Sequence, residues 1–278
     1  MNFNSKAADV FYPGELPLEK TTHLCIGAHP DDVEIMAAAP ILECYGKKDK
    51  NFTAVVVSDG AGSPRSGIYG NCTDDDIKKI RMQEQHTAAI VGKYLAVFQL
   101  GYTSADIKQR ENDNIVNDLR EILLKTTPQT VYVHNLADKH PTHVASSLKT
   151  IKALRTLPKN MRPQSVIACE VWRGLDWLCD DDKFILDTTP YPNISAALVG
   201  VYDSQISGGK RYDLASEGRR RANATYFDSH SVDNIESMNF GMDITELIKN
   251  DSLDVETFVM KHIEKFGEEV RQLLKTVG

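Results

Sequence analysis

Short stretches rich in β-branched residues alternate with longer stretches of helical periodicity through the first part of the chain. This alternation restricts the possible fold more than any other feature. The predicted strands cover residues 23–28, 52–58, 94–100, 130–134 and 165–172, and the predicted helices cover residues 33–45, 74–91, 112–124 and 142–154. Such alternation is typical of a parallel sheet sandwiched between helices, so the sequence predicts an α/β fold.

The pattern loosens after Arg173. Residues 190–205 could form a helix, and residues 254–274 have the apolar spacing of an amphipathic helix. No segment rich in proline, glycine or serine divides the 278 residues, and a chain of this length can bury a substantial core. We therefore predict a single domain that spans residues 1–278.

Charge and cysteine usage narrow the class of protein. A formal net charge of -7 argues against nucleic-acid or membrane-surface binding, because both need a basic face. The five cysteines are odd in number and include no Cys-x-x-Cys pair, which is typical of reduced thiols in the cytosol. The first residues lack the pattern of a signal peptide, and no apolar run approaches the roughly 18 residues of a membrane span. These features predict a cytoplasmic protein.

The first predicted strand ends in an unusual polar sequence. His29, Pro30, Asp31 and Asp32 follow the apolar run directly, where a helical pattern begins. A nucleotide-binding sheet would have a glycine-rich phosphate loop at this position, so the sequence does not favour that class of ligand. One aspartate here would be an ordinary helix cap, but a histidine with two neighbouring carboxylates exceeds what a cap requires.

A second polar loop follows the fourth predicted strand and contains Asp138, His140 and His143. Loops that follow parallel strands lie at the same edge of the sheet, where such folds bind ligands. Catalytic zinc usually has three protein ligands, which here could be His29, one of the two aspartates, and one of His140 and His143. The remaining carboxylate and histidine could act as a base and as a donor to an oxyanion or leaving group.

Asp31 and Asp32 cannot have the same role, because successive side chains leave the backbone in divergent directions. One can bind a metal while the other faces the attacking water, and a helix N-terminus favours the ionised form of both. Taken alone, each loop is more often a cap or solvated surface than a site. Both loops together, after strands of one parallel sheet, favour a metal-dependent hydrolase.

Five segments resemble, in order, the motifs of the PIG-L/LmbE-like deacetylase family: AHPDDVE (28–34), SDGAGSPRSG (58–67), RMQEQHTAAIVG (81–92), LGY (100–102) and DKHPTH (138–143). The resemblance covers about residues 22–205 and leaves residues 206–278 less familiar. It implies a Rossmann-like, three-layer α/β/α fold and a zinc-dependent enzyme that removes acetyl groups from N-acetylglucosamine-type sugars. It also implies a homo-oligomer.

The resemblance further implies roles for individual residues. His29, Asp32 and His143 would bind Zn²⁺, and Fe²⁺ or Co²⁺ are alternatives because the same ligand types accept them. Asp31 would be the general base. His140 would stabilise the tetrahedral intermediate or protonate the departing amine.

Three more residues are candidates for substrate binding. Arg65 matches an arginine that resembles a substrate ligand in relatives, and a solvated loop charge is an equal alternative. Asp138 stands where some relatives have a mobile tyrosine, and it could instead orient His140. Tyr202 stands where relatives usually have a histidine, in a segment expected to face the substrate. Thr142 replaces an acidic neighbour of the ligand histidine, which would change the surroundings of the metal and not its ligands.

These features predict a hydrolase that removes the N-acetyl group from an N-acetylglucosamine-type sugar or glycoconjugate and releases acetate. The expected partner is a small acetamido sugar, with no nucleic acid and no membrane. Two alternatives remain open: an amide or ester hydrolase with a non-sugar substrate, and a non-catalytic sugar-binding module on the same fold. Retention of both Asp31 and His140 favours an enzyme, because a pure binder needs no general base.

Overall fold

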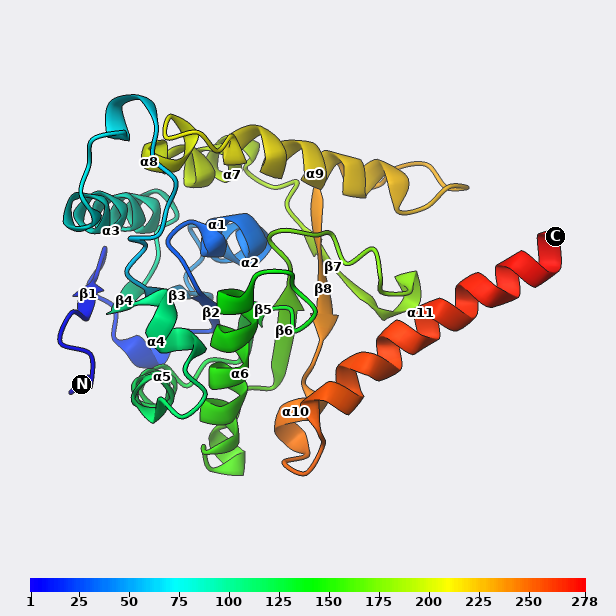
Figure 1. Ribbon diagram of the computed structural model, residues 1–278, viewed down its shortest axis with the longest axis horizontal. Coiled ribbons are helices and arrows are strands. Elements are labelled where there is room, and N and C mark those ends of the chain that lie inside the picture. The colour runs from blue at the N-terminus through cyan, green and yellow to red at the C-terminus, as the bar shows by residue number, and fades with distance from the viewer.

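A computed structural model describes residues 1–278 and shows one sheet with helices on both faces (Figure 1). Its strands are β1 (Asp9–Phe11), β2 (His23–Gly27), β3 (Phe52–Ser58), β4 (Ala96–Tyr102), β5 (Thr130–His134), β6 (Ser165–Cys169), β7 (Lys183–Asp187) and β8 (Met238–Asp243). Across the sheet they follow the order β1-β4-β3-β2-β5-β6-β8-β7. The predicted α/β fold is therefore confirmed.

The helices are α1 (Asp32–Met36), α2 (Ala38–Cys44), α3 (Asp74–Val91), α4 (Ser104–Lys108), α5 (Asp113–Thr126), α6 (Pro141–Arg155), α7 (Pro192–Gly200), α8 (Asp203–Ile206), α9 (Tyr212–Tyr226), α10 (Glu246–Lys249) and α11 (Val255–Val277). Two hydrophobic clusters separate the layers. One lies between the sheet and α5, α6, α10 and the start of α11, and the other lies between the opposite face and α1, α2, α3 and α7. None of the helices combines the length and apolar composition that a membrane span needs.

The parallel centre of the sheet determines where ligands can bind. The chain runs from β2 outward through β3 to β4, and then returns to β5 on the other side of β2. The strand order therefore reverses between β2 and β5, and parallel sheets bind ligands in the crevice at such a switch point. Both polar loops that the sequence singled out follow these two strands.

The predicted parallel sheet forms the centre, β4-β3-β2-β5-β6, and antiparallel strands that the sequence did not predict extend it at both edges. β1 pairs antiparallel with β4, and β8 pairs antiparallel with both β6 and β7. The predicted strands over residues 52–58 and 130–134 have the observed bounds. The strand predicted over residues 94–100 begins two residues late, because the Tyr94 N–H still donates to Ala89 O, 2.9 Å away, in the last turn of α3.

The first predicted helix is divided into α1 and α2. Pro40 has no N–H to donate to the carbonyl four residues earlier, so the helix cannot continue unbroken. Side chains from α9 and β8 satisfy the carbonyls at this break: Arg220 Nη2 lies 2.8 Å from Glu34 O, and Asn239 Nδ2 lies 3.2 Å from Met36 O. The C-terminal part of the chain thus holds the short helix that follows the first polar loop.

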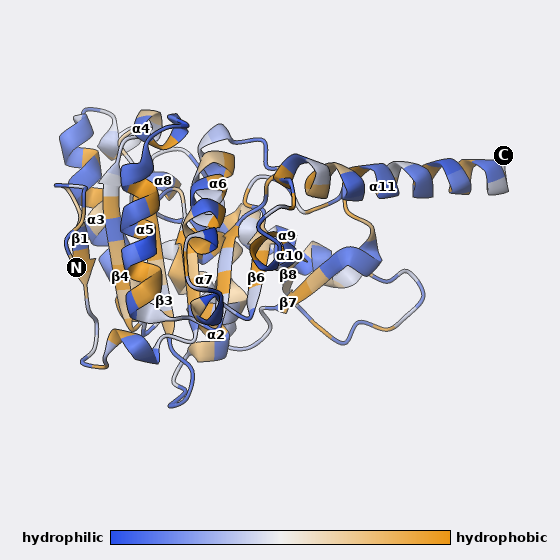
Figure 2. Ribbon diagram, turned by 90° about the horizontal axis from the view of Figure 1, so that it is seen from below, coloured by the Kyte–Doolittle hydropathy of each residue, from blue (hydrophilic) through white to orange (hydrophobic).

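The predicted C-terminal amphipathic helix is confirmed as α11, which continues to Val277. Figures 1 and 2 show that α11 starts against the body of the molecule and then runs away from it, so that the C-terminus lies far from the sheet. Phe258, near its start, is its only buried residue.

Candidate active site

Two helices begin beside one another at the switch point. α1 follows β2 through the first polar loop, and α6 follows β5 through the second. Gly27 permits the first turn, because a Cβ there would lie only 2.9 Å from Val33 Cγ2. His140 is the N-cap residue of α6, Pro141 is its first residue, and His143 lies within its first turn. The two loops therefore bring histidines and carboxylates together.

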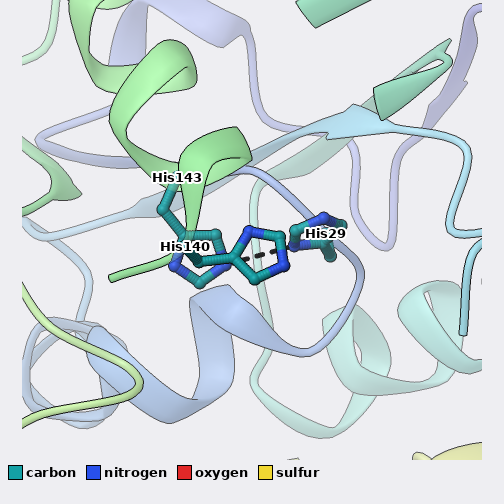
Figure 3. A group of neighbouring side chains, drawn as sticks. All are labelled: His29, His140 and His143. Atoms are coloured by element: carbon teal, nitrogen blue, oxygen red, sulfur yellow. Dashed lines mark hydrogen bonds between the residues drawn. The ribbon is translucent and has the colours of Figure 1, made fainter. Parts of the chain in front are cut away.

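Three potential ligand atoms form a small triangle. His29 Nδ1 lies 3.1 Å from Asp32 Oδ2 and 3.2 Å from His143 Nε2, and His143 Nε2 lies 3.4 Å from Asp32 Oδ2. Ligand atoms about 2.0 Å from a tetrahedral zinc ion are roughly 3.3 Å from one another. The two nitrogens and one oxygen therefore fit a single divalent metal ion. Figure 3 shows His29 and His143 pointing toward each other with His140 alongside.

Two more histidines lie near this triangle. His134 Nε2 is 3.3 Å from Asp32 Oδ2, but it accepts a hydrogen bond from the Ala28 N–H at 2.8 Å, so its lone pair is already used. The His140 ring centre lies 5.0 Å from that of His29, on the cleft side of the triangle. His134 therefore packs against Asp32 without a free lone pair for a metal, whereas His140 faces the space where a substrate would bind.

Asp138 lies behind the triangle and contacts both parts of the second loop. Its Oδ2 is 3.0 Å from His143 Nδ1, and its Oδ1 accepts from the His140 backbone N–H at 2.9 Å. A carboxylate on one ring nitrogen of a histidine leaves the other nitrogen free as a metal ligand. The Asp138 side chain is fully buried and orients His143. This corrects the prediction that it contacts the substrate or orients the His140 ring.

The electrostatics of the triangle favour a positive charge beside Asp32. Burial alone would raise the pKa of Asp32, but His143 and His29 hold it well below its usual range. Burial favours the neutral form of His143, yet Asp32 and Asp138 raise its pKa. This raised pKa favours a positive charge between the two carboxylates, and a metal ion bound at the triangle would supply such a charge.

Asp31 points to a different partner. Its backbone has φ 89°, a strained conformation for a residue other than glycine. Its Oδ2 accepts from Arg81 Nη2 at 2.8 Å, and Arg81 also donates to Pro30 O and Ser63 Oγ. Burial raises the pKa of Asp31 to about 8, against the opposing effect of Arg81. The two adjacent aspartates thus diverge, as the sequence predicted.

A cleft of about 350 Å³ opens above these groups. Its walls include Arg81 and Tyr212, to which the sequence assigned no role there, and Trp172, for which stacking on a sugar and a place in the core were equal expectations. The Trp172 ring is nearly parallel to that of His140, with ring centres 6.3 Å apart and planes at 9°. Burial, Asp31 and Asp32 raise the pKa of Tyr212, so its hydroxyl keeps its proton near the carboxylates.

Two other predicted substrate-binding residues lie outside the cleft wall. Arg65 donates to Cys72 O and Ala61 O, at 2.9 and 2.7 Å, and pairs with Asp74. Tyr202 is 1% exposed. Its hydroxyl donates to Glu34 Oε2 at 2.7 Å. The Arg65 side chain therefore holds its own loop together, and Tyr202 anchors α1, the helix that carries Asp32. Both contacts point away from the cleft, which corrects the predicted contact of these residues with substrate.

The sheet order, with this polar cleft at the switch point, defines a three-layer α/β protein that binds its ligand between two βα loops. The family model of PIG-L, described as GlcNAc-PI de-N-acetylase, matches residues 24–168, which is more than half of the chain. This chain therefore belongs to the PIG-L family. No functionally curated protein matches its sequence.

Solved structures show the same fold at low sequence identity. The conserved protein TT1542 from Thermus thermophilus is 17% identical, with a TM-score of 0.63 over 79% of this chain and 93% of that chain. The N,N'-diacetylchitobiose deacetylase from Pyrococcus horikoshii is 16% identical, with a TM-score of 0.64 over 86% and 88%. GalB, the 4-carboxy-2-hydroxymuconate hydratase from Pseudomonas putida, is 18% identical, with a TM-score of 0.62 over 81% and 95%. Since one of these is a hydratase, the likeness shows the fold alone.

Proposed function

We propose that this protein is a metal-dependent deacetylase that hydrolyses the N-acetyl group of an N-acetylglucosamine-type sugar or glycoconjugate and releases acetate. The observation that carries the proposal is the triangle of His29, Asp32 and His143 beside a separate carboxylate, Asp31. Membership of the PIG-L family supports the acetyl group as the target.

The triangle would hold the metal ion, for which we propose Zn²⁺, with Fe²⁺ and Co²⁺ as alternatives. Such an ion polarises a carbonyl and makes a nearby water more acidic. Asp31 accepts the proton of the attacking water, because it is the one carboxylate of the cleft outside the triangle. Arg81 holds Asp31 in place through the 2.8 Å hydrogen bond and favours its ionised form.

His140 and Tyr212 supply hydrogen bonds from the cleft wall. Burial and the neighbouring His143 and His29 lower the pKa of His140, so its ring is neutral at pH 7 and carries one N–H. That N–H and the Tyr212 hydroxyl are the donors for the oxyanion that forms as water adds to the acetyl carbonyl. The proton that Asp31 receives is then returned to the departing amine, directly or through His140.

The size and walls of the cleft suit a small sugar. A volume of about 350 Å³ lies in the range of small-molecule pockets. Trp172 offers an aromatic surface on one wall, and aromatic rings pack well against the apolar face of a sugar. A neighbouring structure that acts on N,N'-diacetylchitobiose also supports a substrate of this kind.

We also propose a cytoplasmic location. All five cysteines are unpaired, and four of them are buried. Free thiols are typical of a reducing compartment, where disulfides do not persist. We also propose that the protein forms a homo-oligomer, as the family resemblance implies.

Acetate release tests the proposed function. The protein would be stripped of metal, reloaded with Zn²⁺, Fe²⁺ or Co²⁺, and assayed with free and conjugated N-acetylhexosamines, together with simple amides and esters. We expect acetate only from the acetamido sugars and only after reloading. Equal turnover of simple amides or esters would favour the alternative hydrolase, and tight sugar binding without acetate would favour a binding module.

A further inference from the structure

Trp172 forms part of the cleft wall and lies in a turn that follows β6. The buried carboxylate of Glu170 closes this turn, because it accepts hydrogen bonds from the Leu175 N–H at 2.7 Å and from the Trp177 indole N–H at 3.3 Å. Neither hydrogen bond involves residues 171–173. The backbone that carries the Trp172 ring therefore depends on other contacts.

Arg219 of α9 supplies those contacts. Its Nη1 donates to Val171 O and, at 3.3 Å, to Arg173 O, and its Nη2 lies 3.5 Å from Trp172 O. No other group in the chain donates a hydrogen bond to these carbonyls, and the Arg219 side chain donates to nothing else. The exposed Arg173 side chain adds one contact, from its Nη1 to Ala137 O at 3.0 Å. One guanidinium therefore holds three consecutive carbonyls of the turn.

α9 also contacts the Trp172 ring itself. Tyr212 and Arg219 lie on one face of α9, because seven residues make about two helical turns. Tyr212 lines the cleft, and its ring is edge-on to that of Trp172, with ring centres 6.1 Å apart and planes at 78°. All three residues lie beyond residues 24–168, which the family model matches. This wall of the cleft is therefore separate in sequence from the motifs that carry the proposed metal ligands.

We propose that Arg219 is a positioning residue that sets the affinity for the sugar by holding Trp172 against it. The inference rests on the proposed function, in which the Trp172 ring packs against the sugar. A gap of about 0.5 to 1 Å already loses roughly a quarter to a half of the attraction between packed atoms, so a small shift of the turn matters. The sugar face keeps this contact throughout the reaction, and loss of such uniform binding raises KM and leaves kcat unchanged.

Steady-state acetate release by the zinc-loaded protein tests the proposal, with N-acetylglucosamine and N,N'-diacetylchitobiose as substrates. Arg219→Met should raise KM by roughly fivefold and change kcat by less than about twofold. Arg219→Lys keeps a donor but can reach fewer carbonyls, so its KM should lie between the two. Arg221→Met is the matched control, because Arg221 is exposed and pairs with Glu217 in its own helix, and its KM should equal that of the wild type. A wild-type KM in Arg219→Met would overturn the proposal.

A double-mutant cycle separates positioning from a general loss of stability. Trp172→Ala should raise KM by about tenfold, because the ring itself is lost. Arg219→Met added to Trp172→Ala should then raise KM no further, since the two changes remove one and the same contact. An undiminished effect of Arg219→Met in the Trp172→Ala protein would contradict the proposal, because Arg219 would then act through another group.

Fluorescence tests the position of the ring without turnover. The chain has two tryptophans, so the emission of Trp172 is the difference between each protein and the same protein with Trp172→Phe. In Arg219→Met this emission should shift to longer wavelength and be quenched more strongly by acrylamide, whereas Arg221→Met should leave it unchanged. The same emission in both variants would show that Arg219 does not hold the ring. A shifted emission in Arg219→Met with no acetate release by the wild type would leave Arg219 as the holder of Trp172 and refute the proposed function alone.

Discussion

At the residue scale, the candidate site depends on the different directions in which the side chains of Asp31 and Asp32 point. Asp32 faces His29 and His143, whereas Asp31, in a left-handed backbone conformation, faces Arg81. The conformation at Asp31 costs on the order of 1–3 kcal/mol, which the surrounding contacts must offset. Under the proposed function, the same contacts would give Asp32 to the metal and Asp31 to the water.

Arg81 should set the pH at which Asp31 works. The base must be ionised, and the Arg81 cation favours its ionised form, so removal of that charge raises the pKa of Asp31. In Arg81→Met we expect the acidic limb of the kcat/KM profile to move to higher pH by about one unit, with a loss of about tenfold at neutral pH. Arg81→Lys keeps a cation and should shift the limb less. Superimposable profiles for all three proteins would show that Arg81 does not act on the base.

Asp138 should affect metal affinity without touching the metal. Its carboxylate fixes the ring of His143, and loss of such a contact typically weakens metal binding by about 10- to 100-fold. We expect Asp138→Asn to lose affinity in this range, measured by competition with a chelating dye. An affinity equal to that of the wild type would contradict the role of Asp138 behind the ligand.

The sequence identified the residues of the triangle but not all of the cleft. His29, Asp32 and His143 lie in two short motifs that directly follow strands, so their meeting could be anticipated. Arg81 lies inside a helix, and only the close passage of that helix over Gly60, where a Cβ would be 3.0 Å from Arg81 Cδ, brings it to Asp31. Arg81 begins the motif RMQEQHTAAIVG, but its role beside Asp31 depends on this tertiary contact, which the motif alone does not show.

At the element scale, α1 is short and depends on the C-terminal part of the chain. Arg220, buried at 2% exposure, donates to Ser195 Oγ and to the carbonyls of Glu34 and Ile35 at 2.8 to 3.0 Å. These hydrogen bonds satisfy a helix end that Pro40 would otherwise leave open. α9 is therefore part of the support of the metal site, although it lies far from α1 in the sequence.

Loss of the Arg220 contacts should destabilise the whole fold. Arg220→Met leaves several buried acceptors without donors, which costs about 3 kcal/mol, or roughly 6 to 12 °C in Tm for a chain of this size. Arg221→Met is the matched control, because Arg221 is exposed and pairs only with Glu217 in its own helix, so we expect a change below about 0.5 kcal/mol. Equal Tm values for the two variants in a thermal melt would contradict the role of Arg220.

The sequence predicted best the helices and strands whose own residues carry a clear apolar pattern. Strands β3 and β5 are buried apolar runs, and α3 has helical periodicity throughout. By contrast, β7 has one buried residue in five and β1 has three residues, so neither carries a periodic signal. These edge strands form by pairing with β4 and β8, and the local sequence of β1 and β7 gives no sign of that pairing.

At the scale of the whole molecule, the fold explains why the site is assembled from two motifs more than a hundred residues apart. β2 and β5 are neighbours only because the chain passes through β3 and β4 before it returns. The proposed metal site therefore depends on the complete parallel sheet. It should in turn stabilise that sheet, because an ion that binds only the folded chain shifts the unfolding equilibrium.

The division of labour between Asp31 and Asp32 is the central claim, and a paired measurement of metal content and acetate release tests it most directly. Asp31→Asn suits the left-handed conformation, which asparagine tolerates, so the loop should keep its shape. We expect Asp31→Asn to bind one metal ion per chain and to lose at least a hundredfold in acetate release. Asp32→Asn should lose both the metal and the activity. Full activity in Asp31→Asn, or loss of its metal with retention in Asp32→Asn, would contradict the account.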